Sequence, residues 1–200
     1  MLKKIGLGVL VVIAVLVVVI ATRPAAFSIE RNATIAASPE VVFSFLDDFH
    51  QWSKWSPWDK RDPNMRRTYE GAPSGVGAMY SWEGNSQVGE GRMTLTESQP
   101  NERVRIKLDF IKPFTATNEV DLTIKPAAGA VVVAWVMRGN NNFMAKAFSM
   151  VMDMDKMVGK DFEAGLGQLK QASEEEARRR ADEAKKKTAA PPVAAVPPKP

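Results

Sequence analysis

Few residues of this 200-residue chain have the types and spacing that catalysis requires. His50 is the only histidine and the chain has no cysteine, which excludes thiolate catalysis and zinc sites built on cysteine. Acid–base chemistry would fall to His50, Tyr80 or Asp155, and burial near an apolar helical stripe would raise the pKa of Asp155. No triad spacing and no phosphate-binding loop accompanies these residues. We therefore assign no catalytic residue and expect no metal and no cofactor. His50 is expected to be structural, and Asp155 either faces water or points into a cavity.

Three of the five tryptophans lie in one short stretch, HQWSKWSPWDKRDPN, residues 50–64. Trp52, Trp55 and Trp58 are spaced three residues apart, so one or two helical turns before Pro57 would bring the first two to nearly the same side. Tryptophan buries a large apolar surface and is also common at membrane interfaces. The stretch is therefore expected to plug one end of the core, to line the lip of a cavity, or to contact a membrane.

Two hydrophobic periods predict the elements that position these residues. Residues 27–35 are typical of a strand, and a helix is expected after Ser38, a good N-cap that is followed by a proline. Between residues 65 and 139 apolar side chains alternate with polar ones, most clearly in RVRIKLDF, and turn signals separate the runs. Short strands with short connections predict an antiparallel sheet.

The period returns to 3.6 after about Asn142, which predicts one long C-terminal helix. Its apolar face would hold Met144, Phe148, Val151, Val158, Phe162 and Leu169. The methionines of this segment are expected either to fill an ordinary core or to line an apolar pocket. Three glycines interrupt the helix, and a close approach to the sheet or a bend would explain them. The predicted fold class is α+β, with a strongly bent antiparallel sheet and a long C-terminal helix against it.

The first apolar run, IGLGVLVVIAVLVVVIAT, occupies residues 5–22 and carries no charge. As a helix it would be ~27 Å long, close to the ~30 Å hydrocarbon core of a bilayer. We expect a transmembrane anchor, with a cleaved signal peptide as the alternative. Two lysines precede the run and only Arg23 follows it. Residues 1–4 would therefore be cytoplasmic, and the remainder of this single-pass protein of the cytoplasmic membrane would face the periplasm or the exterior.

The formal net charge of +4 comes from the two ends of the chain. Residues 24–173 contain 17 basic and 18 acidic residues, so the central part offers no general attraction for nucleic acid, and no nucleic-acid partner is expected. After a linker at 23–26, the globular domain is expected at 27–173. Residues 174–187 pair opposite charges at i,i+4 and are typical of a solvated helical extension. Residues 188–200 are rich in proline and alanine and are expected to form a disordered tail.

The chain resembles the START-like, or SRPBCC, superfamily, and within it the polyketide cyclase/dehydrase-like branch with a single N-terminal membrane segment. The resemblance extends over residues 27–170 and is carried by WSKWSPWDKRDPN, YEGAPSGVGAMYSWEGN, VGEGRMTLTESQPNERVRIKLDFIKPF and MVGKDFEAGLGQLK. It implies a helix-grip fold, in which a curved antiparallel sheet wraps around the C-terminal helix and leaves an apolar cavity. Members bind lipids, sterols, polyketides or hormones, and some catalyse aromatic ring closure.

Side chains that face the helix or the cavity are the candidate ligand-binding residues: Trp52, Trp55, Trp58, Tyr80, Trp82, Leu95, Ile106, Leu108, Leu122, Trp135, Phe148, Met152 and Asp155. The favoured hypothesis is a membrane-anchored domain that binds an apolar small molecule or lipid. One alternative is an enzyme of the cyclase or dehydratase kind. Another is an interaction module that uses the charged helix and the proline-rich tail. The oligomeric state is not predicted.

Overall fold

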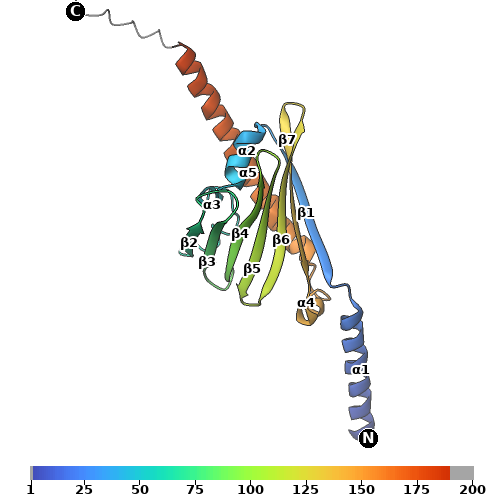
Figure 1. Ribbon diagram of the computed structural model, residues 1–200. Helices are drawn as coiled ribbons and strands as arrows, with labels where there is room; N and C mark the ends of the chain where they lie inside the picture. Colours follow the sequence, from blue (N-terminus) through green and yellow to red (C-terminus); the bar gives the residue numbers. More distant parts are fainter. Residues whose placement is uncertain (1, 190–200) are drawn as a thin grey trace, which may run out of the picture.

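The structure is a computed structural model that describes residues 2–189. One curved sheet grips a long helix, and a further helix leaves the domain at its N-terminal end (Figure 1). The elements in chain order are α1 (Leu2–Thr22), β1 (Ala26–Ile35), α2 (Pro39–Leu46), α3 (Phe49–Trp52), β2 (Arg66–Gly71), β3 (Ala78–Glu83), β4 (Glu90–Gln99), β5 (Arg103–Lys112), β6 (Ala116–Ala127), β7 (Ala130–Asn140), α4 (Phe143–Phe148) and α5 (Met154–Ala189).

The sheet has seven strands in the order β1-β7-β6-β5-β4-β3-β2, and every neighbouring pair is antiparallel. Its register defines two ends. Ala26 pairs with Asn140 and Glu90 pairs with Lys112, so these residues lie at the end from which α1 leaves, which we call the α1 end. The opposite end carries α2, which packs against β6 and α5.

The first half of α5 lies against the concave face of the sheet and forms the centre of the core. Phe162, Leu166 and Leu169 are each at most 2% exposed. Gly165 allows this close approach, because a Cβ there would lie 2.8 Å from the Trp135 ring. The α+β class, the bent antiparallel sheet and the helix-grip arrangement predicted from the sequence are all confirmed.

The prediction of one uninterrupted helix from Asn142 was wrong. The Asn142 side chain caps α4 by accepting a hydrogen bond from the amide of Ala145, and α4 ends at Phe148. Asp153 then starts α5, because its carboxylate accepts from the amide of Lys156. The break changes the helical phase. Residues placed on the inner face upstream of it lie in solvent instead, and Val151 is 82% exposed.

The second half of α5 leaves the domain on the side opposite α1 (Figure 1). The carboxylate of Glu174 accepts from the amide of Ala36, and Lys170 donates to the carbonyl of Thr34, which fastens the middle of α5 to the end of β1. Residues 174–187 are helical and α5 continues to Ala189. Most of the predicted proline-rich tail, from residue 190 onward, lies outside the described residues.

Candidate ligand cavity

A cavity of about 300 Å³ lies between the concave face of the sheet and the first turns of α5. It occupies the half of the domain nearest the α1 end. The lining strand positions Met93 and Leu108 lie nearer this end than the fully buried inward positions Leu95 and Ile106. The wall is mostly apolar, which is typical of small-molecule sites.

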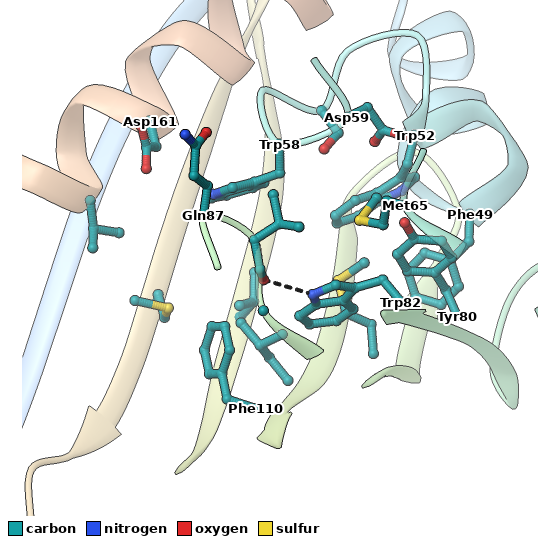
Figure 2. A pocket seen from close by; sticks show the side chains of 18 of the residues that line it. Phe49, Trp52, Trp58, Asp59, Met65, Tyr80, Trp82, Gln87, Phe110 and Asp161 are labelled. Atoms are coloured by element: carbon teal, nitrogen blue, oxygen red, sulfur yellow. Dashed lines mark hydrogen bonds between the residues drawn. The ribbon is translucent and has the colours of Figure 1, made fainter. Parts of the chain in front are cut away.

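Aromatic rings from several elements and one loop form much of the wall. Trp135 of β7 stacks on Phe162 of α5 with ring centroids 4.3 Å apart, and Trp58 meets Trp135 edge-on at 5.9 Å. Trp82 of β3 meets Phe110 of β5 edge-on at 6.0 Å. Its indole N–H donates to the carbonyl of Val88 at 3.0 Å, the dashed line in Figure 2. Such edge-to-face and stacked pairs stabilise large rings in defined positions, so the wall is preorganised.

Two tryptophans are held by the C-terminal end of α2. The indole N–H of Trp52 donates to the carbonyl of Leu46, and that of Trp55 donates to the carbonyl of Phe45, each at 3.1 Å. The last carbonyls of a helix have no partner within it, so the indoles satisfy groups that would otherwise be buried unpaired. Trp52 reaches the cavity, whereas Trp55 is completely buried behind it and plugs the core. Trp58 also lines the cavity.

A small polar group faces one side of the cavity. The carboxylate of Asp59 accepts a hydrogen bond of 2.7 Å from Nε of Arg67, and its side chain is only 11% exposed. Figure 2 shows Asp59 on the side of the cavity where Trp52 and Trp58 lie. Burial, and then the nearby Asp59 charge, raise the pKa of Tyr80 well above its ordinary value, so its hydroxyl keeps its proton. The arrangement offers a phenol donor beside a carboxylate that is already paired.

Asp161 and Lys112 complete the charged lining. Asp161 projects from α5 and pairs with Arg61. Lys112 lies at the α1 end and pairs with Glu90 at 2.6 Å. Each charge at the cavity wall described so far thus has an opposite partner, which lowers the cost of placing it beside an apolar space.

The structure places the thirteen sequence-derived candidates in three environments. Six line the cavity: Trp52, Trp58, Tyr80, Trp82, Leu108 and Trp135. Four are core residues outside the lining: Trp55, Leu95, Ile106 and Leu122. Three lie on the surface away from it: Phe148, Met152 and Asp155.

The placement of these three surface residues is corrected by the helix break. Phe148 is the last residue of α4 and Met152 lies in the following turn, and they are 49% and 40% exposed. Asp155 is in the first turn of α5, where it pairs with Arg31 of β1 at 3.0 Å. His50 also lies outside the cavity; its Nδ1 is 2.8 Å from the Asp48 carboxylate and its ring stacks on Tyr69.

Several lining residues were not among the sequence candidates. Phe49, Met65 and Asp59 come from loops or a helix end, where no period indicates which way a side chain points, and Asp161 lies within α5. Alternation in RMTLTE and NEVDLTIK predicts inward faces for Met93 and Val120, and Phe162 belongs to the predicted apolar helix face, but the sequence does not show which of these positions reach a cavity. One sequence signal could have indicated Asp59, because it directly follows Trp58, which was a cavity candidate, in WSPWDK.

A seven-stranded antiparallel sheet that grips one helix around an apolar cavity defines a helix-grip domain of the SRPBCC type. The sequence profile of the family described as "Polyketide cyclase / dehydrase and lipid transport" matches residues 26–174, and the chain belongs to this family. The resemblance proposed from the sequence is therefore confirmed. No functionally curated protein sequence matches the chain.

Solved structures share the fold at low sequence identity. Protein CV1439 from Chromobacterium violaceum superposes with a TM-score of 0.55 at 16% identity, covering 74% of this chain and 96% of that one. Aha1 from Colwellia psychrerythraea, solved as a dimer, gives 0.54 at 19% identity over 74% and 96% of the two chains. StfQ, a di-domain aromatase/cyclase from the steffimycin biosynthetic pathway, gives 0.55 at 12% identity over 79% and 52%. At these identities the comparison establishes the fold alone.

Proposed function

We propose that the protein is a membrane-anchored binding protein for an apolar small molecule or lipid. The observation that carries the proposal is the cavity of about 300 Å³, walled by aromatic and aliphatic side chains that other contacts hold in place. Burying an apolar ligand there releases water from both surfaces, at roughly 25 cal/mol per Å². The phenol of Tyr80 supplies a donor for one polar atom of the ligand.

In this proposal α1 is the membrane anchor. Lys4–Thr22 is long and apolar enough to cross a membrane, and its side chains are almost all exposed, unlike those of a core helix. An N-terminal signal sequence would have the same length and composition. The surplus of lysine before α1 favours a domain on the outer side of the membrane.

Ligand uptake provides the test. Full-length protein extracted with native lipids is examined by native mass spectrometry, and the purified protein is titrated with a fluorescent fatty acid. Leu108→Trp adds volume inside the cavity and is expected to abolish uptake. Val76→Trp adds the same ring at a position 60% exposed, away from the cavity, and is expected to bind normally. A protein that carries no lipid and takes up no fatty acid, or equal binding by both variants, would overturn the proposal.

The cavity also favours one particular form of the enzymatic alternative. Of the three acid–base candidates chosen from the sequence, only Tyr80 lies in the cavity, and Asp59 lies beside it. A proton-holding phenol could donate to a carbonyl oxygen during ring closure or dehydration. Tyr80→Phe keeps the ring and removes only the hydroxyl. Loss of turnover with retained ligand binding would support this second function, and unchanged turnover would remove it.

A further inference from the structure

An exposed apolar surface of the described domain lies at the α1 end. It consists of the segment 143–152, which contains α4 and the turn after it, and the tip of the β5–β6 hairpin. Its exposed members are Ile111, Phe114, Phe143, Met144, Phe148, Met150, Val151 and Met152, and Phe114 and Val151 are 75% and 82% exposed. We call these residues the α1-end patch. Exposed apolar groups of this kind mark an interface.

One hydrogen bond joins the patch segment to the end of α1, and a second joins the residues before α4 to the linker. Lys146 of α4 donates to the carbonyl of Ala21, and the amide of Asn141 donates to the carbonyl of Ala25. Where α4 lies against α1, Ile20 is only 7% exposed, while residues 4–19 of α1 are exposed. Figure 1 shows α4 and the β5–β6 hairpin on the side of the sheet from which α1 leaves.

The linker restricts where the patch can go. Only residues 23–25 separate α1 from β1, and three extended residues span at most about 10 Å. If α1 crosses the bilayer, the α1 end of the sheet cannot rise out of the headgroup region. The short linker would therefore keep the patch at the headgroup region, whatever its composition.

The composition of the patch fits an interface with lipid. Within residues 141–152 the only ionisable side chain is Lys146, and phenylalanine and methionine predominate. Short apolar segments with a basic residue bind in the boundary between headgroups and acyl chains, roughly 5–10 Å deep. Acidic residues, which anionic lipid would repel, begin only at Asp153.

We propose that the α1-end patch is a second membrane contact, which inserts into the outer boundary of the bilayer and holds the cavity half of the domain against it. The proposal rests on the membrane anchoring proposed above. It commits to lipid as the occupant, and a second copy of the chain or another protein on the patch would contradict it. The hairpin that carries Phe114 also supplies Lys112 and Pro113 to the cavity wall, so the contact places the cavity next to the membrane.

Three exposed valines allow a matched test, because the chain has no cysteine of its own. Val12 lies in α1 and Val151 lies in the patch. Val76 lies in the β2–β3 turn, where the amide of the neighbouring Gly77 donates to the carbonyl of the buried Leu95. Each valine is replaced by cysteine in a separate variant. The exposed fractions are 67%, 82% and 60%, so none of the changes disturbs the core. Each full-length variant is labelled with the fluorophore NBD and reconstituted into vesicles of phosphatidylethanolamine and phosphatidylglycerol.

Phosphatidylcholine with a nitroxide on its acyl chain then quenches labels that contact the hydrocarbon. We expect quenching and a blue-shifted emission at positions 12 and 151, and neither at position 76. Quenching at 12 without quenching at 151 would overturn the second contact and leave the anchor intact. Absence of quenching at 12 would refute the anchor. In that case quenching at 151 would still support a membrane contact of the patch, and its absence would overturn both proposals.

Discussion

Two glycines in one helix give a sharp test of how closely α5 approaches the sheet. Gly165 is buried, and a Cβ at this position would lie 2.8 Å from the Trp135 ring and 3.2 Å from Cδ of Pro57. Gly167 is exposed, and a Cβ there would meet no atom within 4 Å. The same change, glycine to alanine, is therefore expected to have different effects at two positions only two residues apart.

The magnitudes follow from two terms. Replacing a helical glycine by alanine stabilises a helix by roughly 1 kcal/mol, and this term is the same at both positions. Overpacking a tight core costs about 1–3 kcal/mol, and it applies only at Gly165 because Trp135 is held between Phe162 and Trp55. Gly167→Ala should raise the free energy of unfolding by about 1 kcal/mol. Gly165→Ala should leave it unchanged or lower it by up to about 2 kcal/mol.

The assay is urea unfolding of the full-length protein in detergent, followed by tryptophan fluorescence. The difference between the two variants isolates the clash, because the helix term cancels. A gap of about 1–3 kcal/mol is expected. Equal stabilisation by both substitutions would show that α5 does not press on Trp135, and would refute the description of the cavity wall.

Three further predictions concern other contacts. Trp55→Phe leaves the carbonyl of Phe45 unpaired and should lower the free energy of unfolding in urea by about 1–3 kcal/mol. Trp58→Phe at the cavity wall should mainly weaken fatty-acid uptake. A large loss of stability in Trp58→Phe together with a loss of uptake alone in Trp55→Phe would contradict the roles given to the two rings. Two arginines lower the pKa of Glu176 to about 2, so its stabilisation of α5 is present above pH 4.5, its ordinary value, and is lost as the pH falls toward 2. Glu176→Gln should flatten this pH dependence of helical circular dichroism, and an unchanged profile would reject it. Arg31→Gln removes both ion pairs to the first turns of α5 and should speed their amide hydrogen exchange several-fold, whereas unaltered exchange would show that the pairs do not hold α5.

The strand faces could be predicted from the sequence because alternation has a period of two. In RVRIKLDF the inward residues were identified correctly, yet Val104 and Ile106 fill the core while Leu108 and Phe110 line the cavity. Core and cavity wall both require apolar side chains, so alternation does not show where along a strand the packing stops. The boundary between core and cavity is determined by where α5 and the tryptophan-containing stretch 50–64 pack against the sheet.

The end of the sheet near α4 could not be predicted for a different reason. The spacing of Phe148, Val151 and Val158 fits one helical face, but hydrophobic period alone does not reveal a break in the backbone. The signals for the break were polar: Asn142 caps one helix and Asp153 starts the next. An apolar surface that faces lipid has the same composition as one that faces a core, which is why this segment was assigned to the inner face.

The length of α5 has a consequence for the layout of the molecule relative to the membrane. Its 36 residues correspond to a rod of about 54 Å. The second half of this rod leaves the domain on the side opposite α1. If α1 crosses the bilayer and the α1-end patch contacts the bilayer surface, the last turns of α5 would lie far from the headgroups. A fluorescent donor on Lys185 would then report the tilt of the domain through energy transfer to acceptor dyes in the bilayer. The helix whose first turns line the cavity would thus report, through the distance of its last turns from the bilayer, how the domain is oriented on the membrane.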